Sequence, residues 1–156
     1  MIAADNPHVE PVTETLVFDD KTELVSTAAQ RFVDVVTAAQ RERGVAHVVL
    51  TGGSNGIAIL AALATGAGVT ADGLDWTNIE IYWGDDRFVP DGDPDRNAGQ
   101  ARDALLAHVP VDPAKVHPMA PSDGPLGDDI AAAAADYARL LASLSADGVA
   151  PEFDLH

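Results

Sequence analysis

The stretch VAHVVLTGGSNGIAILAALAT, residues 45–65, joins a β-branched run to an apolar helical pattern through a glycine-rich turn. Residues 45–51 are almost continuously apolar, which is typical of a strand that is buried on both faces of a sheet. Residues 57–65 predict a buried helix that follows the turn. A buried strand that leads into a helix is the repeating unit of α/β proteins. We therefore expect a parallel sheet in which residues 51–56 lie at the carboxyl end of one strand.

The flanking segments continue the alternation of strands and helices. Further strands are expected at 14–18 (ETLVF), 78–84 (NIEIYWG) and 116–119 (VHPM), and PEFDLH at 151–156 resembles the entry to another strand. Further helices are expected at 20–43, 98–109 and 130–148. The predicted fold class is therefore α/β, an open and mainly parallel, Rossmann-like sheet with helices on both faces.

Local signals set some of the helix boundaries. Asp20 followed by Glu23 is the capping box that begins a helix, and Gly44 is suited to end it. In the last helix the expected apolar face consists of Ile130, Tyr137, Leu141 and Leu144, and Gly148 is placed to end that helix.

The composition describes an ordinary globular chain. Its 156 residues, 47% hydrophobic, predict a single domain over 1–156, with 1–13 as a flexible N-terminal segment. No apolar run approaches the roughly 18 residues of a membrane span, and the first residues lack a signal peptide's zones. The absence of cysteine excludes disulfides, thiolate metal sites and cysteine nucleophiles. A cytoplasmic protein is expected.

The charge is strongly acidic. Nine Lys+Arg residues against 25 Asp+Glu give a net charge of −16. Nucleic acid and anionic lipid are poor partners for such a surface, because both are bound by neutralising phosphates with Lys and Arg. A pocket for a small anion must then be a local exception, made from helix N-termini and a few arginines.

The turn TGGSNG at 51–56 admits several interpretations. A Walker A loop requires lysine after its last glycine, and the dinucleotide fingerprint requires G-x-G-x-x-G, so neither fits. The nucleophile elbow G-x-S-x-G does fit, with Ser54 as nucleophile of a serine hydrolase. The histidines after it, His108 and His117, are poor partners because one ends a helix and the other precedes a proline. The acidic loop 85–95 lacks the ligand order of a calcium loop, and no metal site is predicted.

Longer motifs resemble the 6-phosphogluconolactonase family, which is related to the glucosamine-6-phosphate deaminases. The turn resembles its (S/T)-G-G-S-T/S-P, and YWGDDRFVP at 82–90 resembles W-x-D-E-R-x-V-P. NAGQARDALLAHVP at 97–110 resembles S-N-x-x-x-A-R-x-x-L-L, and FDLH at 153–156 resembles the start of F-D-L-x-L-L-G-M-G-x-D-G-H. The resemblance covers 14–156 in the same order and implies the N-terminal portion of such a domain.

The chain departs from this family pattern at several positions. Asn55-Gly56 stands in place of T/S-P, Asp86 in place of Glu, and Arg96 in place of the Ser before Asn97. The histidine of G-x-D-G-H, the family's general base, would lie beyond His156, so the resemblance implies a C-terminally truncated chain. Its catalytic residue is therefore unknown, and the activity of 1–156 alone is doubtful.

The resemblance implies hydrolysis of 6-phospho-D-glucono-1,5-lactone to 6-phosphogluconate in the pentose phosphate pathway, by a monomer without metal or organic cofactor. The expected substrate- and phosphate-binding residues are Thr51, Gly52, Gly53, Ser54, Asp85, Asp86, Arg87 and Asn97. The alternatives are a non-catalytic phosphosugar-binding protein, the serine hydrolase that uses Ser54, and a deaminase-like enzyme. The deaminase is weaker because GDDRFVP follows the lactonase form.

Overall fold

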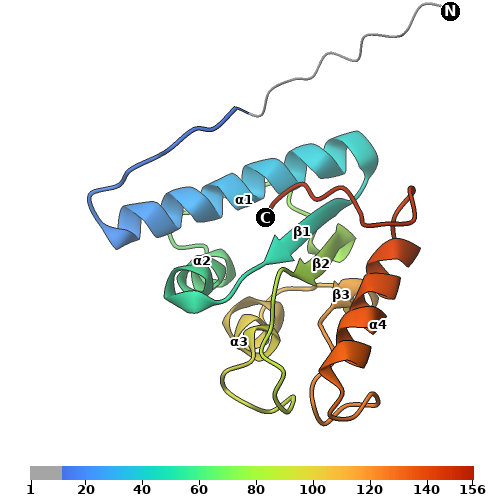
Figure 1. The fold of residues 1–156 in the computed structure, drawn as a ribbon. Coiled ribbons are helices and arrows are strands. Elements are labelled where there is room, and N and C mark those ends of the chain that lie inside the picture. Colours follow the sequence, from blue (N-terminus) through green and yellow to red (C-terminus); the bar gives the residue numbers. More distant parts are fainter. Residues whose placement is uncertain (1–11) are drawn as a thin grey trace, which may run out of the picture.

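The computed structural model describes residues 12–156. Its helices and strands follow one another along the chain as α1 (Lys21–Arg43), β1 (Ala46–Leu50), α2 (Gly53–Thr65), the 3-10 turn η1 (Trp76–Asn78), β2 (Ile79–Trp83), α3 (Asn97–Ala101), the π-helical turn η2 (Arg102–Leu106), the 3-10 turn η3 (Pro113–Lys115), β3 (Val116–His117) and α4 (Ile130–Ser143). The expected alternation of strands and helices is confirmed (Figure 1).

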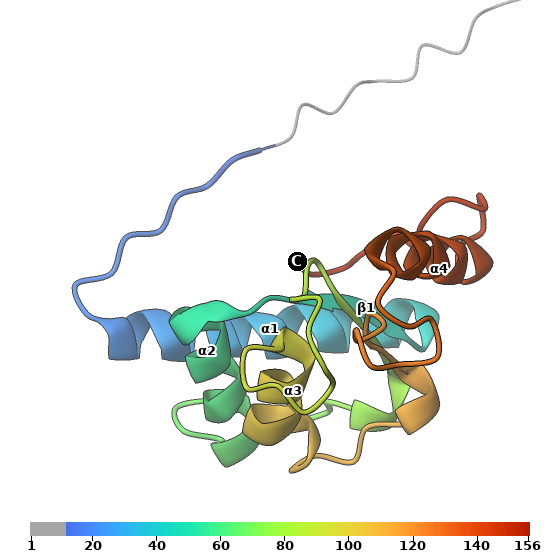
Figure 2. The same cartoon turned by 60° about the horizontal axis from the view of Figure 1, so that its bottom comes forward.

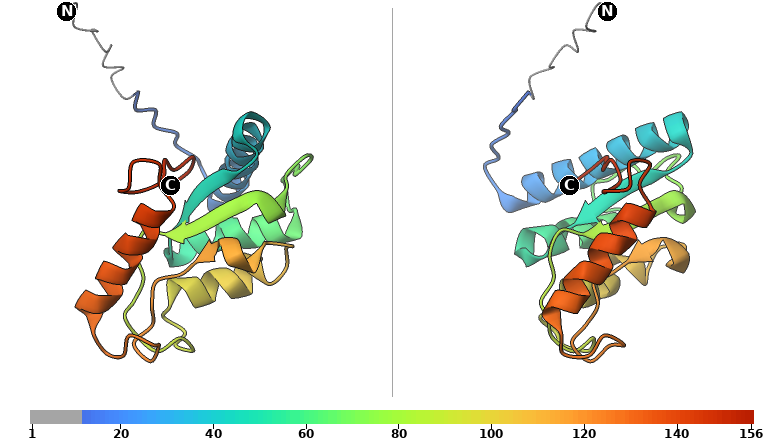
Figure 3. Two further views of the ribbon diagram at one scale, coloured as in Figure 1. Left: turned by 90° about the vertical axis from the view of Figure 1, so that its right-hand side faces the viewer. Right: turned by 45° about the vertical axis from the view of Figure 1, so that its right-hand side comes forward.

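The three strands form one parallel sheet in the order β1-β2-β3. In the register, Val48 is opposite Ile81 and Leu50 is opposite Trp83, so β1 and β2 end side by side. The helices α1, α2 and α3 lie on one side of this sheet and α4 lies on the other (Figures 2 and 3). The predicted parallel α/β class, with helices on both faces, is confirmed.

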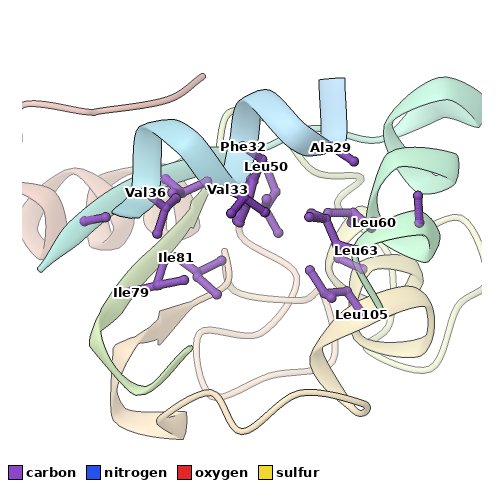
Figure 4. Packing of buried hydrophobic residues seen from close by; sticks show 14 of the residues in the cluster. Ala29, Phe32, Val33, Val36, Leu50, Leu60, Leu63, Ile79, Ile81 and Leu105 are labelled. Atoms are coloured by element: carbon purple, nitrogen blue, oxygen red, sulfur yellow. The ribbon is translucent and has the colours of Figure 1, made fainter. Parts of the chain in front are cut away.

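The main core lies between the sheet and α1, α2 and α3 (Figure 4). From α1 it receives Phe32, Val33 and Val36, and the facing strands β1 and β2 contribute Val48 and Ile81. These side chains are at most 4% exposed. Burial of each contributes on the order of 1.5–3 kcal/mol relative to an exposed position. The core therefore fixes the two strands whose carboxyl ends carry the candidate site.

The second face of the sheet carries aromatic and titratable side chains. Tyr82 stacks between His47 and His117, at centroid distances of 5.9 and 5.1 Å. His117 Nε2 lies 2.6 Å from a Glu80 carboxylate oxygen. Burial raises the pKa of Tyr82, and that of Tyr137 on the covering helix α4, so both phenols stay protonated near neutral pH.

The boundaries of α1 agree with the expected signals. The Asp20 side chain accepts a hydrogen bond from Glu23 N, and Gly44 ends the helix with a left-handed φ of 81°. The helix α2 begins at Gly53, earlier than the expected 57. The expected helix 98–109 is divided: α3 gives way to η2, in which Ala107 N donates to Arg102 O.

Other expected elements are wrong or incomplete. No strand forms at 14–18; Leu16 and Val17 are 61% and 88% exposed, and β-propensity alone does not make a strand without a partner. The last helix ends at Ser143 because the turn that follows it is closed by side-chain-to-backbone bonds, such as Val149 N to Asp147 Oδ1. Ile130, expected on its apolar face, is 65% exposed.

The C-terminal segment pairs with the outer edge of β1 through a single parallel bridge between Val48 and Leu155. The expected strand entry at 151–156 is therefore present only as this bridge. The expected flexible segment 1–13 lies, up to residue 11, outside the described residues.

Tyr137 joins α4 to the sheet, and its removal is expected to destabilise the fold. Its hydroxyl accepts a 3.0 Å bond from Trp83 N and donates a 2.9 Å bond to His117 O. Tyr137→Phe leaves the buried Trp83 N–H unpaired and should lower the free energy of unfolding by about 1–3 kcal/mol, measured by urea denaturation. The control Tyr82→Phe leaves no backbone group unpaired and should cost about 1 kcal/mol or less. Equal losses would contradict this account.

Candidate functional site

The candidate site lies where β1 and β2 end. Gly84 N donates to Leu50 O at 3.2 Å, so the pairing of the two strands continues to their last residues. The turn 51–54 leaves β1 and the loop 84–96 leaves β2 at this edge. Ligands of open α/β sheets bind outside the carboxyl ends of the strands. All eight predicted site residues lie in these two segments or directly after them.

The N-terminus of α2 offers unpaired backbone donors. Gly52 is its N-cap and makes no side-chain cap bond, and Gly53 adopts a φ of 84°, where L side chains are strained. The first N–H groups of a helix have no partner within the helix, and its dipole places about half a positive charge there. Thr51 and Ser54 are exposed beside these donors.

Asn97 connects the turn after β1 to the loop after β2. Its Oδ1 accepts a 3.0 Å bond from Arg87 Nη1, and its Nδ2 donates a 3.1 Å bond to Asp85 O. Gly52 packs directly on it: a Cβ on Gly52 would lie 2.1 Å from Asn97 Oδ1. Asn97 is only 2% exposed. Gly52, Asn97 and Arg87 therefore form one fixed unit.

Asp86 is buried behind that unit. Its carboxylate accepts from Asn97 N at 2.7 Å, from Ala98 N at 3.1 Å and from Arg87 N at 2.8 Å. Its side chain is 2% exposed. These bonds hold the start of α3 against the exit of β2. The sequence analysis grouped Asp86 with the ligand-binding residues, whereas in the structure its carboxylate oxygens accept hydrogen bonds from backbone N–H groups.

Asp85 and Arg87 face outward. Arg87 Nη1 lies 3.7 Å from Asp85 Oδ2, and the two side chains are 54% and 68% exposed. The ion pair is loose and solvated, so it contributes little to stability. Only one of the five N–H donors of Arg87 is bonded to Asn97, so the guanidinium retains donors for a ligand.

A polar cleft of about 490 Å³ opens between α2 and α3. It is lined by Gly53, Ser54, Ile57, Arg87, Asp95, Asn97 and Gln100. Arg87 is the single cation that lines it, in the part of the chain that the structure describes. In a chain of net charge −16, a cleft that contains an arginine beside a helix N-terminus is a candidate site for a small anion.

Sequence reasoning missed three residues at this site. Asp95 and Gln100 line the cleft, and Lys21 Nζ lies 3.4 Å from Ser54 O. Lys21 begins α1, which reaches the start of α2 only through the packing of the two helices. No local sequence signal marks such a contact.

Among the histidines of residues 12–156, His156 lies at this edge of the sheet: it lines a neighbouring pocket together with Thr51 and Gly56, and its Nε2 lies 3.2 Å from the position of a Cβ on Gly84. None of these histidines lines the cleft. His108 contacts Asp103 O, His117 contacts Glu80, and His47 contacts Tyr82. Within the same residues no hydrogen bond joins Ser54 Oγ to a histidine, and no group of three His, Asp or Glu side chains is placed to hold a metal ion. None of the described helices is long and apolar enough to cross a membrane.

This arrangement defines a class: a parallel α/β protein with a glycine-rich turn and an open helix N-terminus at the carboxyl edge of its sheet. Residues 19–156 match the model of the glucosamine-6-phosphate isomerases/6-phosphogluconolactonase family. The chain belongs to this family.

Similar proteins agree with this assignment. The 6-phosphogluconolactonase of Streptomyces coelicolor is 48% identical over 145 residues, which are 91% of this chain and 55% of that protein. The 6-phosphogluconolactonase of Mycobacterium tuberculosis is 46% identical over 141 residues, 90% of this chain and 56% of that protein. The chain spans about half the length of these relatives.

Solved structures show the same fold. The crystal structure of a devB protein is 25% identical, with a TM-score of 0.70, over 89% of this chain and 55% of that one. The structure of 6-phosphogluconolactonase from Trypanosoma brucei is also 25% identical, with a TM-score of 0.67, over 83% of this chain and 49% of that one.

Proposed function

We propose that this chain forms the phosphate-binding part of a 6-phosphogluconolactonase, which hydrolyses 6-phospho-D-glucono-1,5-lactone to 6-phosphogluconate in the pentose phosphate pathway. The observation that carries the proposal is the fixed unit of Gly52, Asn97 and Arg87, which sets a guanidinium beside the open N-terminus of α2. The names of the Streptomyces and Mycobacterium relatives support the same reaction. A cytoplasmic monomer suits a cysteine-free chain that acts on a soluble metabolite.

In this proposal the phosphate sits at the start of α2. The N–H groups of Gly53 and Ser54 donate to its oxygens, the hydroxyls of Thr51 and Ser54 add donors, and Arg87 supplies the charge. A Cβ on Gly53 would meet no atom within 4 Å, so the anion can approach the backbone closely at this glycine.

The remaining predicted residues orient the substrate and the loop. Asp85, exposed beside Arg87, is placed to accept hydrogen bonds from sugar hydroxyls. Asn97 holds Arg87 in position, and Asp86 holds the start of α3.

The reaction adds water to the lactone carbonyl and breaks the ring C–O bond, which leaves a carboxylate and one proton. Binding at the phosphate holds the reacting carbonyl at a fixed distance from α2 and so contributes orientation. Activation of water also requires a base. No histidine lines the cleft among residues 12–156, and we assign these residues binding and orientation only.

Isothermal titration of the chain with 6-phosphogluconate, gluconate and glucosamine 6-phosphate tests the proposal. We expect 6-phosphogluconate to bind at least about tenfold more tightly than gluconate, because charge-assisted bonds to phosphate contribute roughly 1.5–3 kcal/mol each. Equal binding of the two would contradict a phosphate site. Tighter binding of glucosamine 6-phosphate would favour the deaminase-like alternative.

The reaction itself is followed in a pH-stat, which records the proton released by hydrolysis of the lactone. Uncatalysed hydrolysis is the baseline. Turnover above this baseline supports the lactonase directly. Binding with a rate at the baseline would instead support a phosphosugar-binding protein without catalysis.

Experiments on Ser54 distinguish a phosphate-binding site from the active site of a serine hydrolase. We expect no covalent labelling of Ser54 by a fluorophosphonate, because no histidine contacts its hydroxyl among the described residues. Ser54→Ala should weaken 6-phosphogluconate binding by about fivefold, as expected for loss of one hydroxyl donor of about 1 kcal/mol. Labelling at a single site that Ser54→Ala abolishes would establish the hydrolase instead.

A further inference from the structure

Arg96 is the largest fully buried side chain of the described residues, with 1% exposure. It lies directly before α3. Its Nη2 donates a 2.9 Å bond to Met119 O, just beyond β3. Its Nε and Nη1 make no hydrogen bond within the described part of the chain. Burying a guanidinium with so few bonds is unfavourable unless negative charge compensates it.

Two carboxylates supply that charge. Arg96 Nη2 lies 3.8 Å from Asp86 Oδ2, and both side chains are at most 2% exposed. Arg96 Nε lies 3.6 Å from Asp91 Oδ1, whose side chain is 62% exposed. The pair with Asp86 is buried and poorly screened, so it is the stronger of the two. Each partner is the principal counter-charge of the other.

The contacts continue from Asp86 to the cleft. Asp86 accepts the N–H groups of Asn97 and Ala98, and Asn97 Oδ1 accepts from Arg87. Arg96 thus ties three segments together: the loop after β2, the start of α3 and the residue Met119. No other cation contacts Asp86 in residues 12–156.

We propose that Arg96 is a positioning residue for the phosphosugar site: its buried guanidinium holds the Asp86 carboxylate in place, and Asp86 in turn positions Asn97 and Arg87. This inference rests on the proposed function for its ligand. Arg96 does not line the cleft and acts through these three residues.

Three variants test this role. Arg96→Met removes the charge at similar volume, and Arg96→Lys keeps a cation without the planar fork. Arg102→Met is the matched control, because Arg102 follows α3, is 55% exposed and pairs with Asp103 alone among the described residues. Each →Met variant removes one positive charge from the chain, and Arg96→Lys removes none.

The first readout needs no ligand and no activity. Amide hydrogen exchange is followed at Asn97 and Ala98, with Val48 in β1 as the reference for global stability. We expect exchange at Asn97 and Ala98 to quicken at least about tenfold in Arg96→Met, to a smaller extent in Arg96→Lys, and not in Arg102→Met. If Arg96→Met does not fold, Arg96→Lys decides by the same criterion. Unchanged exchange, or equal acceleration at Val48, would overturn the inference.

The second readout is the affinity for 6-phosphogluconate in the folded variants. We expect it to fall at least about tenfold in Arg96→Met and to stay within about twofold in Arg102→Met. Native affinity in Arg96→Met would overturn the inference. If the unmodified chain binds no 6-phosphogluconate, the proposed function fails, while hydrogen exchange still decides whether Arg96 positions Asn97.

Discussion

Gly52→Ala is expected to weaken 6-phosphogluconate binding by about 100-fold. The new Cβ would lie 2.1 Å from Oδ1 and 2.6 Å from Cγ of Asn97. Asn97 cannot move away freely, because it is buried and hydrogen-bonded to Asp85 and Arg87. Accommodating the methyl group breaks the contact that sets Arg87.

Gly92→Ala is the matched control for this experiment. Gly92 lies in the loop after β2, has no positive φ, and a Cβ there meets no atom within 4 Å. Its affinity should stay within about twofold of the unmodified chain. Isothermal titration measures both variants, and circular dichroism confirms that each is folded. Native affinity in Gly52→Ala would show that the contact between Gly52 and Asn97 has no part in binding.

Arg87→Ala is expected to weaken binding by about 10- to 100-fold. Arg87 is the single cation that lines the cleft among the described residues, and a charge-assisted bond contributes roughly 1.5–3 kcal/mol. The affinity of Arg87→Lys should lie between those of Arg87→Ala and the unmodified chain, because lysine keeps the charge but lacks the paired donors that fit a phosphate. Loss of the solvated ion pair with Asp85 should change stability little, whereas loss of the bond to Asn97 Oδ1 should lower the free energy of unfolding by about 1 kcal/mol.

Arg139→Ala controls for the loss of one positive charge. Arg139 lies on α4, is 69% exposed and pairs only with Asp136 among the described residues. It should bind 6-phosphogluconate with native affinity. A similar loss in Arg139→Ala and Arg87→Ala would mean that net charge alone governs the affinity. The difference in 6-phosphogluconate affinity between Arg87→Ala and the unmodified chain should also decrease as the salt concentration is raised.

Much of the fold could be predicted because its signals are local. The side chain of Asp20 caps α1 and Gly44 ends it, as their positions in the sequence indicate. The β-branched run 45–51 forms β1, which is almost fully buried as its apolar composition predicts, although it lies at one end of the order β1-β2-β3. One failure needs information from distant parts of the chain, and the other concerns a local turn. Residues 14–18 have strand-forming residues and no partner among the described residues, and the end of α4 depends on a turn made by Ser145 and Asp147.

Part of the candidate site could likewise be predicted from the sequence, and part could not. The motifs at 51–54 and 85–87 could be found in the sequence, and the parallel register of β1 and β2 brings them together. The burial of Asp86 could not be found, because it depends on the buried Arg96 and on backbone donors of α3. The approach of Lys21 to Ser54 depends on how α1 packs against α2. Both are tertiary contacts without a local pattern.

The central claim, that the phosphate of a phosphosugar binds at the start of α2, is tested most directly by nuclear magnetic resonance of the ¹⁵N-labelled chain during titration with 6-phosphogluconate. We expect saturable shifts at the amides of Gly52, Gly53 and Ser54 and at Arg87 Nε, with gluconate at equal concentration producing none of them. Saturable shifts that lie elsewhere, or equal shifts with gluconate, would contradict the claim.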